Sequence, residues 1–175
     1  MNKNEANAYM ANILTNDFCD CLTACLVSGV ERIRECQNAL PPYLTLQRHN
    51  RLYSDLSSAC IGLGLLQGHW DRLGLIASEE ARGAYTGIEI TGEALRLVVV
   101  NASSFKPGSK SQHIADCIGL NSAVGHDGQR GVFLLFELDE GKILSTARLV
   151  MRSKNHGELV SVSVYPSFDL AIRVS

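Results

Sequence analysis

Side chains that could bind a metal or act as nucleophiles gather between positions 113 and 127: His113, Asp116, Cys117, His126 and Asp127. If this segment is helical, His113 and Cys117 share a face, because residues four apart are neighbours on a helix. A loop could return the other two groups to them. Such a cluster could bind zinc or form a cysteine–histidine nucleophile pair. Because no C-x-x-C or H-x-x-x-H spacing supports either site, we expect a buried Cys117 and an exposed His113.

A second group combines carboxylates with a lysine around a predicted hairpin turn: Glu137, Asp139, Glu140 and Lys142. The run Glu140-Gly141-Lys142 resembles the acidic-x-Lys element of restriction-endonuclease-like nucleases. The resemblance implies carboxylates that hold a magnesium ion and a lysine beside the attacking water. That chemistry requires a rigid strand flanked by a further carboxylate. Because the element falls in a turn, we interpret it as solvated charge. A metal-dependent nuclease or hydrolase that also uses Asp127 stays an alternative function.

A third group is a basic row of Arg148, Arg152 and Lys154 close to Arg130. Alternation places Arg148 and Arg152 on one face of a strand, where aromatic and basic side chains together can bind single-stranded nucleic acid. Aromatic residues make up only 6% of the chain. We therefore expect Arg148 to pair with Glu137 across the hairpin, and we keep a nucleic-acid-binding module as a second alternative.

The composition predicts an ordered protein of one domain that requires no cofactor or metal. The 175 residues are 46% apolar and 19% charged, with a formal net charge of -2. A polar N-terminus and the lack of a long apolar run predict a cytoplasmic protein without a membrane segment. We expect the six cysteines to be reduced thiols in the core, including the group Cys19, Cys21, Cys25 and Cys36.

The first half of the chain has helical periodicity. Apolar residues at spacings of three and four predict helices over residues 4–14, 16–40 and 45–73, with Asn16 or Asp17 as a cap, and one more turn from residue 78. Pro41-Pro42 ends the second helix. The third helix is expected to bury one apolar stripe: Leu52, Leu56, Ala59, Cys60, Leu63, Leu66 and Trp70.

Near Thr86 the apolar period changes from helical to alternating, which predicts strands. The clearest feature is a hairpin over residues 131–152, with Leu138 opposite Ile143 and Gly141 supplying a positive φ. A short helix over 109–120 precedes it, and a last strand is expected to bury Leu170, Ile172 and Val174. The predicted fold is α+β: a helical subdomain (1–85) packs on one face of a five- or six-stranded, mostly antiparallel sheet (86–175), with one shared core.

The second face of this sheet is the predicted binding surface. It combines apolar residues with arginine, the residue types enriched at interfaces: Phe133, Leu135, Leu144, Arg148, Val150 and Arg152. Either the short helix at 109–120 or another chain must cover it, because a monomer avoids a large exposed apolar patch. No group assembles a nucleophile, base and orienting residue at suitable spacing. We therefore predict a non-enzymatic protein-binding factor, such as a bacterial or phage inhibitor or antitoxin-like protein, whose partner is another protein or a second copy in a homodimer.

Overall fold

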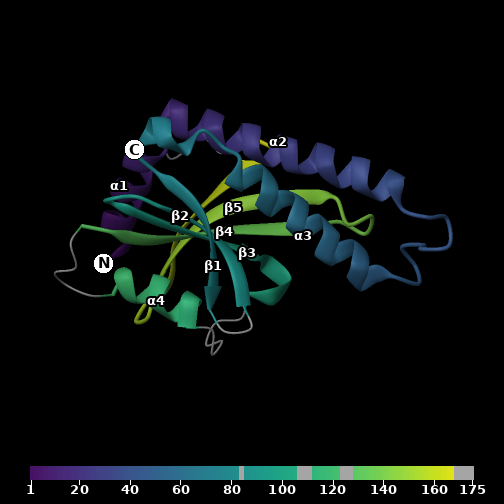
Figure 1. Ribbon diagram of the computed structural model, residues 1–175. Helices are drawn as coiled ribbons and strands as arrows, with labels where there is room; N and C mark the ends of the chain where they lie inside the picture. The colour runs from purple at the N-terminus through teal and green to yellow at the C-terminus, as the bar shows by residue number, and fades with distance from the viewer. Residues whose placement is uncertain (83–84, 106–111, 123–127, 168–175) are drawn as a thin grey trace.

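Helices cover both faces of a curved sheet in the computed structural model (Figure 1). The structure describes residues 1–82, 85–105, 112–122 and 128–167. The predicted last strand with Leu170, Ile172 and Val174 lies outside these residues. In the described part the α-helices are α1 (Lys3–Ile13), α2 (Asn16–Ala39), α3 (Asn50–Leu66) and α4 (Gln112–Leu120), with 3-10 turns η1 (Trp70–Leu73) and η2 (Ala102–Ser104).

The strands follow one another through the sheet in chain order. They are β1 (Ile76–Arg82), β2 (Tyr85–Thr91), β3 (Leu95–Asn101), β4 (Arg130–Leu138), β5 (Leu144–Ser153) and β6 (Gly157–Tyr165). Neighbouring strands are antiparallel except β3 and β4, which are parallel. A parallel connection needs a crossover, and α4 lies in it. The predicted α+β fold with a mostly antiparallel sheet is therefore confirmed.

Local sequence explains where the first helices begin and end. Asn2 and Glu5 form a capping box at the start of α1. Thr15, rather than Asn16 or Asp17, caps α2, since its hydroxyl accepts a hydrogen bond from the Phe18 N–H at 3.2 Å. The helix ends at Ala39, just before the two prolines.

Two elements differ from the sequence prediction. The third helix is shorter than predicted, spanning Asn50–Leu66 instead of 45–73, and η1 follows as a separate turn. Residues 78–80, predicted to form a helical turn, belong to β1, so the sheet begins ten residues before Thr86. The β1 segment pairs along its whole length with β2, and this pairing overrides the weak helical signal of its two glutamates.

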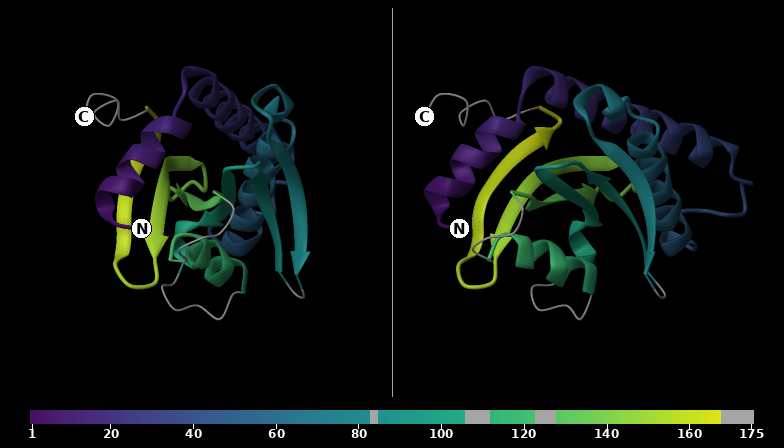
Figure 2. Two further views of the ribbon diagram at one scale, coloured as in Figure 1. Left: turned by 90° about the vertical axis from the view of Figure 1, so that its left-hand side faces the viewer. Right: turned by 60° about the vertical axis from the view of Figure 1, so that its left-hand side comes forward.

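The sheet separates two apolar cores. The larger core lies between α1–α3 and one sheet face, and it contains Phe18, Leu26, Ile61 and Trp70. The smaller core lies on the opposite face, where α4 packs on the central strands. Figure 2 shows this arrangement edge-on, with α1 beside β6 and α4 on the far side of the sheet from α2.

Candidate binding surfaces

The predicted binding face of the sheet is covered by α4. Phe133, Leu135 and Val150 are all buried, and they pack with Ile114 and Cys117 of the helix. The sequence left open whether the short helix or another chain covers this face of the sheet. In the structure the short helix, α4, covers it. These three apolar side chains are therefore part of the core and are not available to a partner.

Leu144 lies on the other face, against α1–α3, so its predicted position was wrong. The cause is a bulge: Glu137 pairs with Thr146, while Leu138 pairs with Leu144 rather than Ile143. The extra residue in β5 places Leu144 on the face opposite to the one that unbroken alternation predicts. The positive φ of the turn is also shifted, since Lys142 and not Gly141 has the left-handed conformation, with φ of 60°.

The two arginines of the predicted surface have partners within the molecule. Arg148 lies 3.8 Å from the Glu158 carboxylate on β6, not beside Glu137, which pairs with Thr146. The Arg152 guanidinium stacks over the ring of Phe105 at 5.5 Å. Two members of the basic row are therefore engaged in contacts within the molecule, while Lys154 is exposed.

The cluster between 113 and 127 is only partly described. Cys117 is buried as predicted, and burial strongly raises the pKa of its thiol. Asp116 accepts a hydrogen bond from the Gln112 amide at 2.6 Å. The backbone of His113 lies in α4, but its side chain, His126 and Asp127 fall outside the described residues. What is described of Cys117 fits a core residue.

The charged hairpin turn is anchored to the helices. Gln37 of α2 and Ser57 of α3 donate hydrogen bonds to the carbonyls of Gly141 and Lys142. Glu137 and Lys142 line a small hollow of about 380 Å³, but Asp139 and Glu140 do not. Among the described residues, no three His, Cys, Asp or Glu side chains lie close enough to hold a metal ion. Of this group, the hollow therefore brings together one carboxylate and the lysine.

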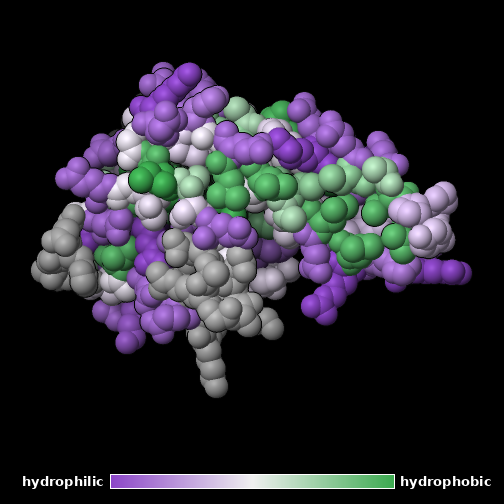
Figure 3. Space-filling model, in the orientation of Figure 1, coloured by the Kyte–Doolittle hydropathy of each residue, from purple (hydrophilic) through white to green (hydrophobic). Residues whose placement is uncertain are grey.

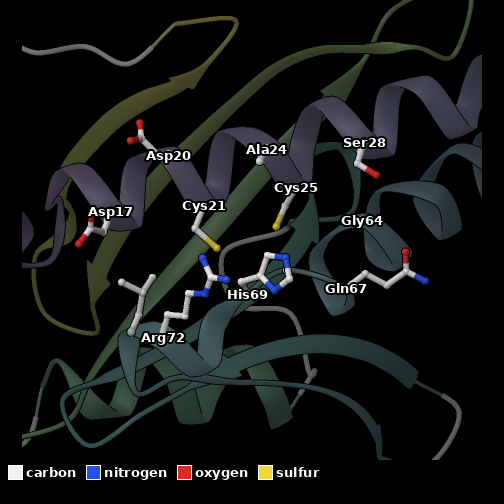
Figure 4. A pocket seen from close by; sticks show the side chains of 12 residues that line it. Asp17, Asp20, Cys21, Ala24, Cys25, Ser28, Gly64, Gln67, His69 and Arg72 are labelled. Atoms are coloured by element: carbon white, nitrogen blue, oxygen red, sulfur yellow. The ribbon is translucent and has the colours of Figure 1, made fainter.

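A larger groove of about 610 Å³ lies between α2 and the segment from the end of α3 to η1. Figure 4 shows Cys21 and Cys25 projecting from α2 toward His69 and Arg72, with Asp17 and Asp20 at one end. Burial raises the pKa of both thiols, that of Cys25 to about 12, although the Arg72 charge opposes the shift at Cys21. Both thiols are therefore protonated at neutral pH and neither is an activated nucleophile.

A row of apolar side chains on α3 is partly open to solvent. Leu52, Ala59 and Leu63 are exposed and Leu56 and Leu66 are half-buried on one side of this helix. These five residues, which we call the α3 seam, were predicted to face the core. Figure 3 shows apolar surface over α3 on the face of the molecule seen in Figure 1.

Most of the seam faces outward because a second side of α3 packs on α2 instead, although Leu56 is partly buried against the larger core, in line with the prediction. The packed side carries Ile61 together with the smaller residues Ser57, Cys60 and Gly64, all of them buried. A Cβ added at Gly64 would lie 2.5 Å from the Cys25 carbonyl oxygen, so the two backbones nearly touch. Trp70, included in the predicted stripe, is buried in η1.

Sequence reasoning missed two buried polar groups. The Arg96 guanidinium binds both carboxylate oxygens of Glu89, at 2.7 and 3.1 Å, beneath α4. The Asn121 amide, fully buried at the end of α4, donates to the carbonyls of Gly131 and Arg152 and accepts from the Gly131 N–H. No sequence signal marks either contact, because each joins segments that only the tertiary fold brings together.

Comparison with known proteins does not assign the chain to a family. No protein-family model matches the chain, and no curated protein or solved structure is significantly similar to it. In the described residues no single helix is long and apolar enough to cross a bilayer. Helices α1 and α2 together have the length and apolar composition of a span, but the chain bends by 78° between them.

Proposed function

We propose that this chain is a protein-binding factor and that the α3 seam binds a second copy of the same chain. The observation that carries the proposal is the seam itself. Leu52 is 41% and Leu63 46% exposed, on a helix whose opposite side is buried against α2 and the larger core. Apolar side chains that line one side of a helix at this density are typical of docking surfaces.

The spacing of the seam fits a helical partner. Its residues are separated by four, three, four and three positions, which is the 3.5-residue period of a coiled-coil contact. Two heptads of this kind span about 21 Å along α3, at 1.5 Å per residue.

The same spacing is nearly symmetric about Ala59, which favours a second copy over an unrelated helix. In an antiparallel pair, Leu52 would face Leu66 of the other copy, and Leu56 would face Leu63. Ala59, the smallest member, would lie at the crossing, where the helices approach most closely. A two-fold dimer requires this kind of self-complementary surface.

Charge allows the contact but does not drive it. The formal net charge of -2 gives little repulsion between copies. Arg51 and Asp55 beside the seam lie 3.8 Å apart in the same copy. The surface that a single helix seam can bury is smaller than the ~800 Å² that each partner buries in a standard interface. We therefore expect reversible, concentration-dependent association.

Sedimentation equilibrium over a wide range of protein concentration tests the proposal. The purified chain should show a monomer–dimer equilibrium, which L63E should shift by at least tenfold toward monomer. Each lost leucine contact costs about 1 kcal/mol in a half-buried site, and the two-fold axis repeats the loss. V27E is the matched control, because Val27 is 43% exposed on α2 and does not belong to the seam.

Each outcome of this experiment has a consequence. A monomeric wild-type chain at all concentrations overturns the proposal, and so does a dimer that L63E and V27E weaken equally. Circular dichroism of both variants should match the wild type. A cytoplasmic location and a role as an inhibitor or antitoxin-like factor stay predictions from the sequence, supported by six free thiols.

A further inference from the structure

Two cysteines from different helices meet at the contact between α2 and α3. The Cys36 and Cys60 sulfur atoms lie 3.9 Å apart, although 24 residues separate them in the chain. Cys60 is 3% exposed, whereas Cys36 is half-buried and open on one side to solvent. The sulfur atoms are thus in van der Waals contact, about 2 Å farther apart than in a disulfide.

Small residues bring the two thiols together. A Cβ added at Gly29 would lie 3.0 Å from the Ile61 Cα and 3.4 Å from the Cys60 carbonyl oxygen, so α2 and α3 approach closely beside Cys60. The two helices run in opposite directions, as Figure 1 shows, and from this contact the Cys60 sulfur reaches that of Cys36. The antiparallel hairpin therefore fixes which thiols can meet.

We propose that Cys36 and Cys60 are a modification site, where exchange with a small disulfide such as oxidised glutathione links α2 to α3. The Cys36 thiolate attacks one sulfur of the small disulfide, whose S–S bond breaks and releases one thiol. The Cys60 thiolate then attacks the Cys36 sulfur, forms the internal disulfide and releases the second thiol. Two protein thiols are oxidised and one small disulfide is reduced to two thiols.

The surroundings of the pair set the order of these steps. Cys36 is the accessible sulfur and reacts first. Burial and the neighbouring Cys36 thiol raise the pKa of Cys60 to about 11, while the charge of Arg32 lowers it. A buried thiol of this kind reacts poorly with solution oxidants, but it is already in place for the intramolecular step.

The nearest competing pair is Cys21 and Cys25, whose thiols also interact. These residues lie four apart on one helix, where closing a disulfide would distort a turn of α2. The Cys36–Cys60 bond closes between two helices and needs only side-chain rotation and a small approach. We therefore expect one specific linkage rather than a mixture.

The test uses the purified full-length chain, incubated with oxidised glutathione and then alkylated under denaturing conditions. Before oxidation six thiols should be alkylated, and afterwards four. Peptide mapping should find one cross-linked pair containing Cys36 and Cys60, reversed by dithiothreitol. The oxidised form should melt about 5–10 °C higher, as expected for a loop of this size.

Variants separate this bond from other thiol chemistry. C36S should abolish the loss of thiols and the rise in melting temperature, whereas C21S should leave both unchanged. The proposal is wrong if all six thiols remain reactive, if the linked peptides contain another pair, or if glutathione stays attached to Cys36. Mapping of the wild-type chain decides between these results even if a variant fails to fold.

Discussion

At the scale of single residues, the contact between α2 and α3 depends on the absence of a side chain. Gly64 lies where a Cβ would be 2.5 Å from the Cys25 carbonyl oxygen and 3.0 Å from the Gly29 nitrogen. Both neighbours are backbone atoms, which cannot rotate away. Close packing here thus outweighs the roughly 1 kcal/mol by which glycine disfavours a helix relative to alanine.

Gly64→Ala should therefore destabilise the protein by about 2–3 kcal/mol, despite the better helix propensity of alanine. The measurement is urea unfolding followed by circular dichroism. Gly119→Ala on α4 is the control, because no atom lies within 4 Å of a Cβ added there. This change should raise the free energy of unfolding by up to ~1 kcal/mol, through the better helix propensity of alanine. Equal effects at both sites would mean that propensity, and not the helix crossing, decides the outcome at Gly64.

Asn121 shows how one buried amide connects three segments. It follows directly after α4, and among the described residues its side-chain hydrogen bonds go to the backbone of β4 and β5. Its nitrogen donates at 2.6 Å and 2.9 Å, and its oxygen accepts at 3.0 Å. A carboxylate of the same shape could keep only the acceptor bond and would face two carbonyl oxygens.

We expect Asn121→Asp to cost about 3 kcal/mol at pH 7, with part of the loss recovered in acid, where a protonated Asp donates again. Unfolding at pH 7 and pH 4, each relative to wild type, measures this difference. The matched change is Asn101→Asp, since Asn101 uses only its oxygen, which accepts from Ser103. The Asn101→Asp control should change the free energy of unfolding by no more than ~0.5 kcal/mol. A similar loss of stability at both sites would contradict the role assigned to the Asn121 nitrogen.

At the scale of elements, periodicity predicted helices and strands well where only one side of an element is apolar. The helical stripe of α2 is of this kind. On β4, which is apolar on both faces, alternation still separated the residues of the two faces correctly. Periodicity was only partly right for α3: Cys60 is buried as predicted, but Leu52 and Leu63 are exposed. The buried side combines Ile61 and Leu65 with Ser57, Gly62 and Gly64, and a count of large apolar residues does not recognise a helix contact made partly by small ones.

The hairpin shows a second limit at the same scale. Alternation predicted the faces of β4 correctly, but a single bulge in β5 moved Leu144 to the opposite face. A bulge adds a residue to one strand without any composition signal. The burial of Phe133, Leu135 and Val150 was foreseen as one of two choices, and only the packing of α4 could decide between them.

At the scale of the whole molecule, the candidate sites depend on packing between distant segments. The groove and the Cys36–Cys60 pair arise where α2 and α3 meet, and each combines residues far apart in the chain. The seam lies on the side of α3 that this contact leaves uncovered. Spacing along the sequence can place thiols on one helix face, as for Cys21 and Cys25. It cannot show which face of a neighbouring helix will lie opposite.

The same packing should make the protein sensitive to alkaline pH. The Cys25 thiol and the Tyr9 phenol, which donates to the Ala94 carbonyl at 2.6 Å, each have a pKa raised by burial to about 12. Their ordinary pKa values are 9.0 and 10.0. Between these ordinary values and 12 the unfolded chain has lost protons that the folded chain retains. The stabilisation is thus complete below about pH 9 and decreases as the pH rises.

Each group can lower the free energy of unfolding by at most about 1.4 kcal/mol per pH unit in this window. Cys25→Ala should therefore flatten the decline between pH 9 and pH 11, measured by urea unfolding at fixed ionic strength. Leu26→Ala is the control, because it removes buried side-chain atoms from α2 without removing a thiol, so its cost should be the same at every pH. If both variants keep the wild-type slope, Cys25 ionises in the folded protein as readily as in the unfolded chain, and its burial does not protect the thiol.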